Sequence, residues 1–83
     1  MDDLQAIQRM KNGDIAGLEI LIVRYQLKAI RAAFFVTHDE LLAEDVVQSM
    51  FIRFFQRVSH FDERREFRPY FMRSVVNAAL NLI

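Results

Sequence analysis

The feature that most constrains the fold of this chain is the recurrence of apolar side chains at helical spacing along almost all of its 83 residues. Residues on one face of an α-helix recur every three or four positions, and only two glycines and one proline are available to interrupt such runs. A chain of this length forms one domain at most. The sequence therefore predicts a single all-α domain over residues 1–83, a compact bundle of about four helices.

The first two predicted helices are separated by a stop signal. Asp2 or Asp3 can accept hydrogen bonds from the free amides of a first turn, so the first helix begins there. Gly13 tolerates the left-handed conformation in which helices end, and Asp14 caps a second helix predicted over about 15–36. Apolar residues line two opposite sides of this helix, which predicts a central position with neighbours in two directions. The two stripes are Leu18, Leu21, Ile22, Tyr25, Ala29, Ala32 and Val36, and Ile20, Val23, Leu27, Ile30 and Phe34.

Two further helices complete the predicted bundle. Thr37 or Asp39 caps the third helix, predicted over about 40–57, and the segment 59–66 reads as a loop. The fourth helix is predicted to run to the end of the chain with Pro69 in its first turn, where a missing amide costs nothing. One arc of this helix is apolar and consists of Phe71, Met72, Val75, Val76, Ala78, Ala79, Leu82 and Ile83.

Composition excludes several classes of protein. The absence of cysteine removes disulfides, thiolate metal sites and cysteine nucleophiles, and it suits a reducing cytoplasm. Two aspartates follow Met1 where a signal peptide would be basic, and no apolar run approaches the ~20 residues of a membrane span. His38 and His60 form no metal-binding pair, and there is no phosphate-binding glycine loop and no nucleophilic serine motif. We therefore expect no enzyme, no cofactor, no metal site and no membrane contact.

Charge is distributed unevenly although the net charge is zero. Residues 1–45 hold eight acidic and five basic side chains, whereas residues 46–83 hold three acidic and six basic ones. Zero net charge argues against a protein that coats duplex DNA without specificity. The uneven distribution of charge predicts that the C-terminal half faces nucleic acid. With counts this small, chance scatter is the alternative.

One side of the third predicted helix carries an unusual row of side chains. The row is Leu41, Asp45, Gln48, Ile52 and Gln56. Their spacing of three or four positions places them on one face. A solvated face usually holds lysine and glutamate, whereas aliphatic anchors among polar groups suit docking against another helix. An ordinary exposed face remains the alternative.

The loop and the fourth helix carry side chains suited to single-stranded nucleic acid. In the loop these are Phe61, Arg64 and Arg65, and along one face of the helix Tyr70, Arg73, Ser74, Asn77 and Asn81. Arginine can clamp phosphates, an aromatic ring can stack on an unpaired base, and asparagine can bond to base edges. A flexible charged loop and solvated amides are the alternatives. Phe67 is more readily explained as a core residue than as a stacking platform.

At this point the sequence resembles region 2 of bacterial sigma factors, most closely the extracytoplasmic-function (ECF) group. The stretch AEDVVQSMFIRFFQRVSHFDERREFRPYFMRSVVNAALNLI matches that group's D-x-x-Q-x-x-F helix, loop and F-R-x-aromatic…R-x-x-x-N helix. The upstream stretch NGDIAGLEILIVRYQLKAIRAAFFV is similar to its opening helices. The resemblance covers effectively the whole chain.

The resemblance implies a promoter-recognition domain that works with the RNA polymerase core. The helix with Asp45, Gln48 and Phe51 would dock on the coiled coil of the β′ clamp. The loop 59–66 and the fourth helix would melt and read the minus-ten promoter element, with a base of the non-template single strand flipped into a pocket. A third possibility, which complements this one, is a state in which an anti-sigma factor covers the same faces.

The sequence departs from the family pattern in three respects. Ser49 replaces the usual acidic residue after Gln48, which puts the strength of the polymerase contact in doubt, and Tyr70 stands where tryptophan is common, which should weaken stacking. Region 4, the second DNA-binding domain, is absent, so we expect this chain to be a piece of a longer protein. Region 2 alone would bind the polymerase core but should not initiate transcription at a full promoter. The rival interpretation is a helical protein–protein interaction domain with no nucleic-acid role, which the neutral charge and the apolar-rich helices support.

Overall fold

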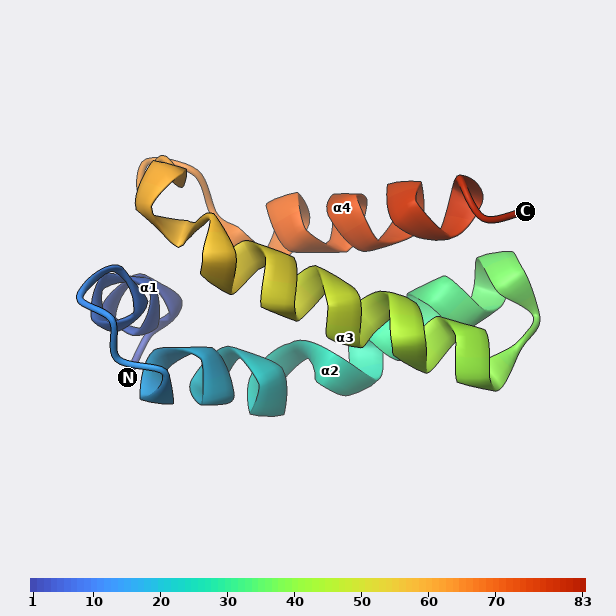
Figure 1. The fold of residues 1–83 in the computed structure, drawn as a ribbon, viewed down its shortest axis with the longest axis horizontal. Helices are drawn as coiled ribbons and strands as arrows, with labels where there is room; N and C mark the ends of the chain where they lie inside the picture. Colours follow the sequence, from blue (N-terminus) through green and yellow to red (C-terminus); the bar gives the residue numbers. More distant parts are fainter.

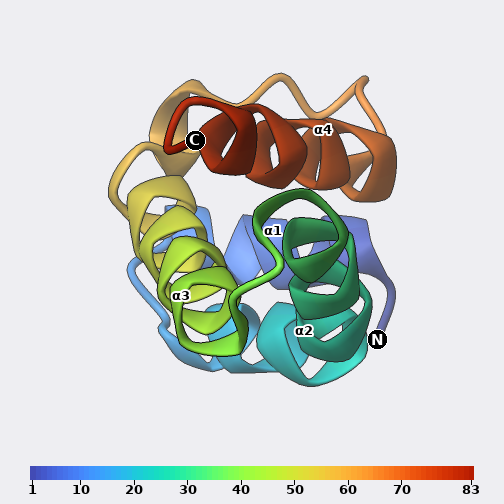
Figure 2. The same cartoon turned by 90° about the vertical axis from the view of Figure 1, so that its right-hand side faces the viewer.

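α2 is the helix on which the rest of the chain is assembled. The computed structural model describes residues 1–83, and α1, α3 and α4 all pack on α2 (Figures 1 and 2). The elements are α1 (Asp3–Lys11), α2 (Ala16–Thr37), α3 (Glu40–Gln56), the short 3-10 turn η1 (Val58–His60) and α4 (Phe67–Leu80). The prediction of an all-α bundle of about four helices is confirmed. None of the helices combines the length and the apolar content that crossing a bilayer requires.

Two of the helices, α1 and α3, begin at residues whose side chains cap them, whereas α2 begins after Ile15 and α4 after Glu66 without a side-chain cap. Asp2 accepts a hydrogen bond from the Gln5 amide at 2.8 Å, and the Gln5 side chain accepts one from the Asp2 amide at 3.0 Å, which forms a capping box. Asp39 accepts a hydrogen bond from the Leu42 amide at 3.1 Å at the start of α3. Both caps follow the predicted boundaries, Asp2 for α1 and Asp39 for α3.

The turn between α1 and α2 depends on glycine at two positions. Gly13 has a φ of +84°, the left-handed conformation predicted for the end of the first helix. Asp14 then accepts a hydrogen bond from the Ala16 amide at 2.9 Å. Gly17 has a different role, because a Cβ there would lie 2.2 Å from the carbonyl oxygen of Ala6. α1 therefore crosses α2 at a point where only a hydrogen atom fits.

The core is entirely apolar apart from one tyrosine hydroxyl. Nineteen side chains form one buried cluster, and aromatic rings occupy its centre. Phe71 stacks on Phe51 with ring centroids 4.3 Å apart and on Phe67 with centroids 5.0 Å apart. Phe67 is 2% exposed, as expected of a core residue. The hydroxyl of Tyr25 donates a hydrogen bond to the carboxylate of Asp3, so α1 and α2 are joined by a polar contact at the edge of the core.

The prediction that α2 is covered on two opposite sides is wrong. Val23 is 85% exposed, Leu27 70% and Phe34 44%, while Ile20 and Ile30 are half-buried. α2 is central, but its three neighbours pack around one side of it and no helix remains to cover the other (Figure 2). The apolar pattern therefore identified a second face without a partner in this chain.

The C-terminal end also differs from the prediction. α4 ends at Leu80, so Leu82 and Ile83 lie beyond the helix and are 56% and 73% exposed. These two residues therefore do not extend the apolar arc into the core. The predicted loop begins with η1, whose Val58 is buried and holds the turn against the core.

Replacing Gly17 with alanine should destabilise the domain. The added methyl group would clash with the Ala6 carbonyl and the Met10 side chain, at 2.2 and 2.8 Å, and overpacking of this kind costs about 1–3 kcal/mol. Urea unfolding measures the loss. Gly13→Ala is the comparison, because nothing lies within 4 Å of the added Cβ. Its only cost is that of an alanine in the left-handed conformation, about 1–2 kcal/mol. Unchanged stability of Gly17→Ala would contradict the close crossing of α1 and α2.

The stability of the domain should fall between about pH 10 and 12 because of Tyr25. Burial, together with the hydrogen bond to Asp3, raises the pKa of Tyr25 to about 12. The folded state then holds a proton that the unfolded state releases from its ordinary pKa near 10, so the free energy of unfolding decreases as pH rises through this window. The loss is about 2–3 kcal/mol at 1.36 kcal/mol per pKa unit. Tyr25→Phe should show a smaller decrease when urea unfolding is compared at both pH values, and equal decreases in the two proteins would remove Tyr25 as the cause.

Candidate functional site

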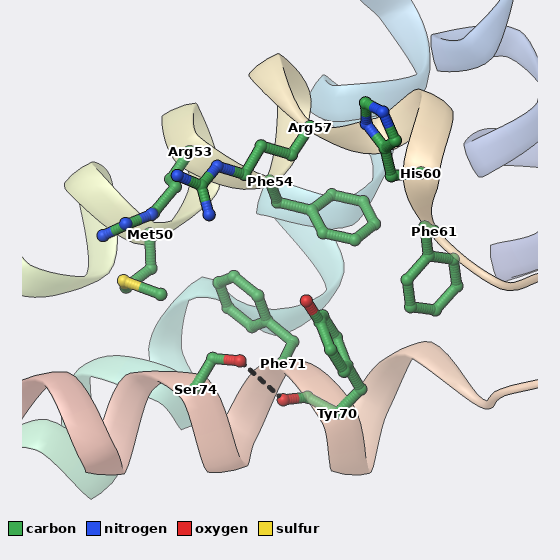
Figure 3. A pocket seen from close by; sticks show the side chains of 9 residues that line it. All are labelled: Met50, Arg53, Phe54, Arg57, His60, Phe61, Tyr70, Phe71 and Ser74. Carbon is green, nitrogen blue, oxygen red and sulfur yellow. Dashed lines mark hydrogen bonds between the residues drawn. The ribbon is translucent and has the colours of Figure 1, made fainter.

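A pocket of about 310 Å³ lies between α3 and the start of α4, next to the loop (Figure 3). Its floor is aromatic and its rim carries cationic side chains. The lining residues are Met50, Arg53, Phe54, Arg57, His60, Phe61, Tyr70, Phe71 and Ser74. A ligand that fits such a pocket has a flat apolar face and polar or anionic edges.

The aromatic side chains of the pocket support one another. Phe61 lies edge-on to Phe54 at 5.2 Å and to Tyr70 at 5.1 Å, and Phe54 lies edge-on to Phe67 at 4.9 Å. Such tilted arrangements are favourable between aromatic quadrupoles and fix the orientation of each ring. Phe54 and Phe61 are buried, whereas Tyr70 is half-buried and keeps part of its ring accessible. Tyr70 is therefore the aromatic residue of the pocket best able to contact a ligand.

Tyr70 is also bound by its polar neighbours. The guanidinium carbon of Arg65 lies 4.7 Å from the centroid of its ring, a cation–π contact. The hydroxyl of Ser74 donates a hydrogen bond to the backbone carbonyl of Tyr70 at 3.0 Å (Figure 3). The loop and α4 thus meet at this residue.

The predicted nucleic-acid residues are placed in three different settings. Phe61 is only 8% exposed, so it supports the pocket from within the core. It does not offer a free ring face to a base, although the sequence had suggested that it would. Arg64 is fully paired within the loop, because its Nη2 lies 2.9 Å from an Asp62 oxygen. This guanidinium lowers the pKa of Asp62 below its usual range. Arg65 covers Tyr70, as described above.

The remaining predicted residues on α4 lie outside the pocket. Arg73 and Asn77 are exposed, and they follow Tyr70 by three and seven positions, so they extend along the helix from the pocket toward its C-terminal end. Asn81 is the C-terminal cap of α4 and is also exposed. The structure therefore unites Tyr70 with the loop and leaves the amides as a separate row.

Two arginines and a histidine of the pocket were missed by sequence reasoning. Arg53 and Arg57 extend from α3 along the side of the pocket opposite α4, and His60 stands at the end of η1 (Figure 3). Their signal was present, since Arg53 and Arg57 are four positions apart on one helix face. The sequence alone could not show that this face borders α4. With Arg64, Arg65, Arg68 and Arg73, all six arginines of residues 46–83 are exposed.

The predicted docking row on α3 is exposed along its whole length. Leu41 is 74% and Ile52 55% exposed, and Asp45, Gln48 and Gln56 are also exposed. Ile52 and Gln48 lie beside a hollow of about 260 Å³ between α3 and α2. Its other lining residues are Leu18, Ile22, Gln26, Val47 and Phe51. Ile22 and Gln26 of α2 were not predicted as part of this face.

α3 therefore separates two surfaces of different chemistry. Met50, Phe54 and Arg57 border the aromatic pocket on the side of α4. Val47 and Gln48 border the mixed apolar and amide hollow on the side of α2. One helix thus fixes the relative positions of both surfaces.

Comparison with known proteins identifies a family. The family model described as Sigma-70 region 2 matches residues 21–83. The RNA polymerase sigma-H factor of Pseudomonas aeruginosa is 29% identical over 79 residues, which cover 95% of this chain and 41% of that protein. The chain thus spans less than half of the length of this curated relative.

A solved structure shares the whole fold. It is an engineered region 2 of sigmaE, determined by NMR in complex with GTAAAA, and it matches with a TM-score of 0.89 and 30% sequence identity. The match covers 99% of this chain and 85% of the engineered one. Together with the family model, which matches more than half of the sequence, this likeness shows that the chain belongs to the sigma-70 region 2 family.

Proposed function

We propose that this chain is the promoter-reading and polymerase-docking domain of an ECF-type sigma factor. In this role it captures a base of the non-template strand at the minus-ten element while α3 binds the clamp of the RNA polymerase β′ subunit. Family membership carries the general assignment. The observation that carries the detailed one is the aromatic pocket with its cationic rim, which faces α4, whereas Gln48 and Ile52 of the docking row lie beside the hollow that faces α2.

The pocket suits a single extruded base. Its volume of about 310 Å³ lies at the lower end of the range of ligand sites, roughly 300–1,000 Å³. Extruding a base from a duplex costs a few kcal/mol, and stacking on an aromatic ring returns about 1–3 kcal/mol. Arg53 and Arg57 at the rim can neutralise the phosphates on either side of that base. The GTAAAA bound by the engineered sigmaE domain of the same fold supports a nucleic-acid ligand.

The docking row suits a protein helix. Leu41 and Ile52 provide exposed aliphatic anchors, and Asp45, Gln48 and Gln56 provide the surrounding polar groups. A polymerase partner follows from the name of the Pseudomonas aeruginosa relative. Docking to polymerase would also place the domain in the cytoplasm. It would compensate for weak binding to free DNA, because the chain has no net charge and residues 46–83 carry only six arginines against three acidic groups. An anti-sigma factor that covered either surface would block the function.

Replacing Tyr70 with leucine should weaken binding of single-stranded DNA. The substitution keeps apolar packing against Phe54 and removes the ring on which a base can stack, so the affinity for GTAAAA should fall about 5- to 150-fold, the equivalent of 1–3 kcal/mol. Asn77→Ala, at an exposed position, should weaken binding less and leave the fold intact. Fluorescence anisotropy with a labelled oligonucleotide measures both, with Asn12→Ala in the turn after α1 as the control. Equal affinities in all four proteins would remove Tyr70 and Asn77 from the site.

Replacing Ile52 with aspartate should abolish docking to the clamp helices of β′. The aliphatic anchor would be exchanged for a charge that must be desolvated on binding, which costs at least tenfold in affinity. Val23→Asp is a matched control, since Val23 is an equally aliphatic and even more exposed residue on the outer face of α2. A pulldown at low salt distinguishes the variants. Loss of binding in both variants, or in neither, would contradict the assignment of the α3 row.

A further inference from the structure

The loop before α4 is bound to α1 by residues that are 50 to 55 positions away in the sequence. Lys11 donates a hydrogen bond from Nζ to the backbone carbonyl of Phe61 at 2.7 Å and forms an ion pair with Glu63 Oε2 at 3.0 Å. Gln8 donates a hydrogen bond from Nε2 to the other oxygen of Glu63 at 3.0 Å. Both oxygens of one carboxylate and one backbone carbonyl of the loop are thus held by α1. We call this set of contacts the α1 latch.

Lys11 is more buried and has more hydrogen-bond acceptors than the lysine of a typical surface ion pair. The side chain of Lys11 is only 22% exposed, and its ammonium group contacts two acceptors from neighbouring parts of the loop. An isolated exposed pair contributes little, but one ammonium shared between a carbonyl and a carboxylate fixes the backbone as well as a side chain. The hydrogen bonds from Lys11 and Gln8 also lower the pKa of Glu63, so the charged carboxylate is the form that the latch binds.

The other hydrogen bonds of the loop join residues that are close in the sequence. Asp62 accepts hydrogen bonds from the amides of Arg64 and Arg65, and the Arg64 guanidinium returns to the same aspartate, so these bonds are local. The latch grips the backbone at Phe61, whose ring supports Tyr70. Four residues after Phe61, the guanidinium of Arg65 lies over the ring of the same tyrosine. Displacement of the loop would therefore move two groups that touch the ring on which a base would stack.

We propose that Lys11 and Gln8 are positioning residues for the base pocket, through which α1 sets the path of the reading loop although it contributes no side chain to the pocket. The inference rests on the proposed function, because it gives α1 a part in the capture of the same base. Release of the latch frees the loop between η1 and α4, loosens Phe61 and Arg65 around Tyr70, and weakens the binding of an unpaired base. The bundle itself stays folded, because the core contacts of α1 run through Ala6, Ile7 and Met10.

The test compares Lys11→Met with Arg9→Met. Both substitutions remove a cation from the last turn of α1, but Arg9 is exposed and makes no side-chain contact with the loop, whereas Lys11 holds it. In Lys11→Met we expect the amides of Phe61, Arg64 and Arg65 to exchange hydrogen about tenfold faster, while amides inside α2 keep their protection. The affinity for GTAAAA should fall about 3- to 10-fold in Lys11→Met and remain nearly unchanged in Arg9→Met. Lys11→Arg, which keeps the charge, should restore part of both effects.

A double-mutant cycle isolates the latch from general stability. Lys11→Met and Glu63→Gln should each weaken oligonucleotide binding, and the double variant should be little worse than Lys11→Met alone, because both substitutions remove the Lys11–Glu63 ion pair and only Lys11→Met also removes the bond to the Phe61 carbonyl. Additive losses, or equal loop exchange and equal affinity in Lys11→Met and Arg9→Met, would overturn the proposal. Should the wild-type chain fail to bind GTAAAA while Lys11→Met still accelerates exchange only in the loop, the proposed function fails and the control of the loop by α1 stands.

Discussion

A continuous set of aromatic rings joins α3, the loop and α4, and both proposed surfaces of the domain depend on it. Phe51 stacks on Phe71 within the core, and Phe54 contacts Phe61 and Phe67 at the edge of the pocket. Large rings in fixed tilted or stacked contacts leave little freedom to the helices that carry them. α3 is consequently held at a defined rotation, and this rotation directs its arginines to one side and Gln48 to the other.

The division of α3 into two sides shows how so small a domain can carry both proposed binding surfaces. A domain of this size buries only about 60–65% of its unfolded surface, so it has little interior in which to build a site. Here the same helix supplies core residues, one wall of the pocket and the docking row. The exposed position of both Gln48 and Asn77 leaves each surface free for its partner.

Much of the fold could be predicted from the sequence, because its signals are local. Capping by Asp2 and Asp39 and the turn at Gly13 depend on neighbouring residues only, and the observed boundaries follow them. The outer stripe of α2 was misjudged, since helical periodicity shows which residues share a face but not whether another helix covers it. Val23, at 85% exposure, is the clearest instance.

The candidate site was less predictable, because a pocket arises where elements distant in the sequence meet. Tyr70 was found from its helix face alone. Phe61 was assigned to the surface since its loop is charged, yet its ring fills the space beside Phe54. Arg53, Arg57 and His60 could not be assigned to the pocket without knowledge that α3 borders α4, although the spacing of the two arginines placed them on one helix face. The α1 latch joins residues at least 50 positions apart, so local sequence patterns could not predict it either.

The close crossing at Gly17 also sets the position of the α1 latch. Ala6 lies against Gly17 at the crossing, and Lys11 lies little more than one turn further along the same short helix. Any side chain that wedged the two helices apart would tilt α1 as a rigid rod and shift its last turn relative to the loop. Variation at Gly17, which lies in neither of the proposed binding surfaces, would then alter the base pocket through the displacement of a nine-residue helix.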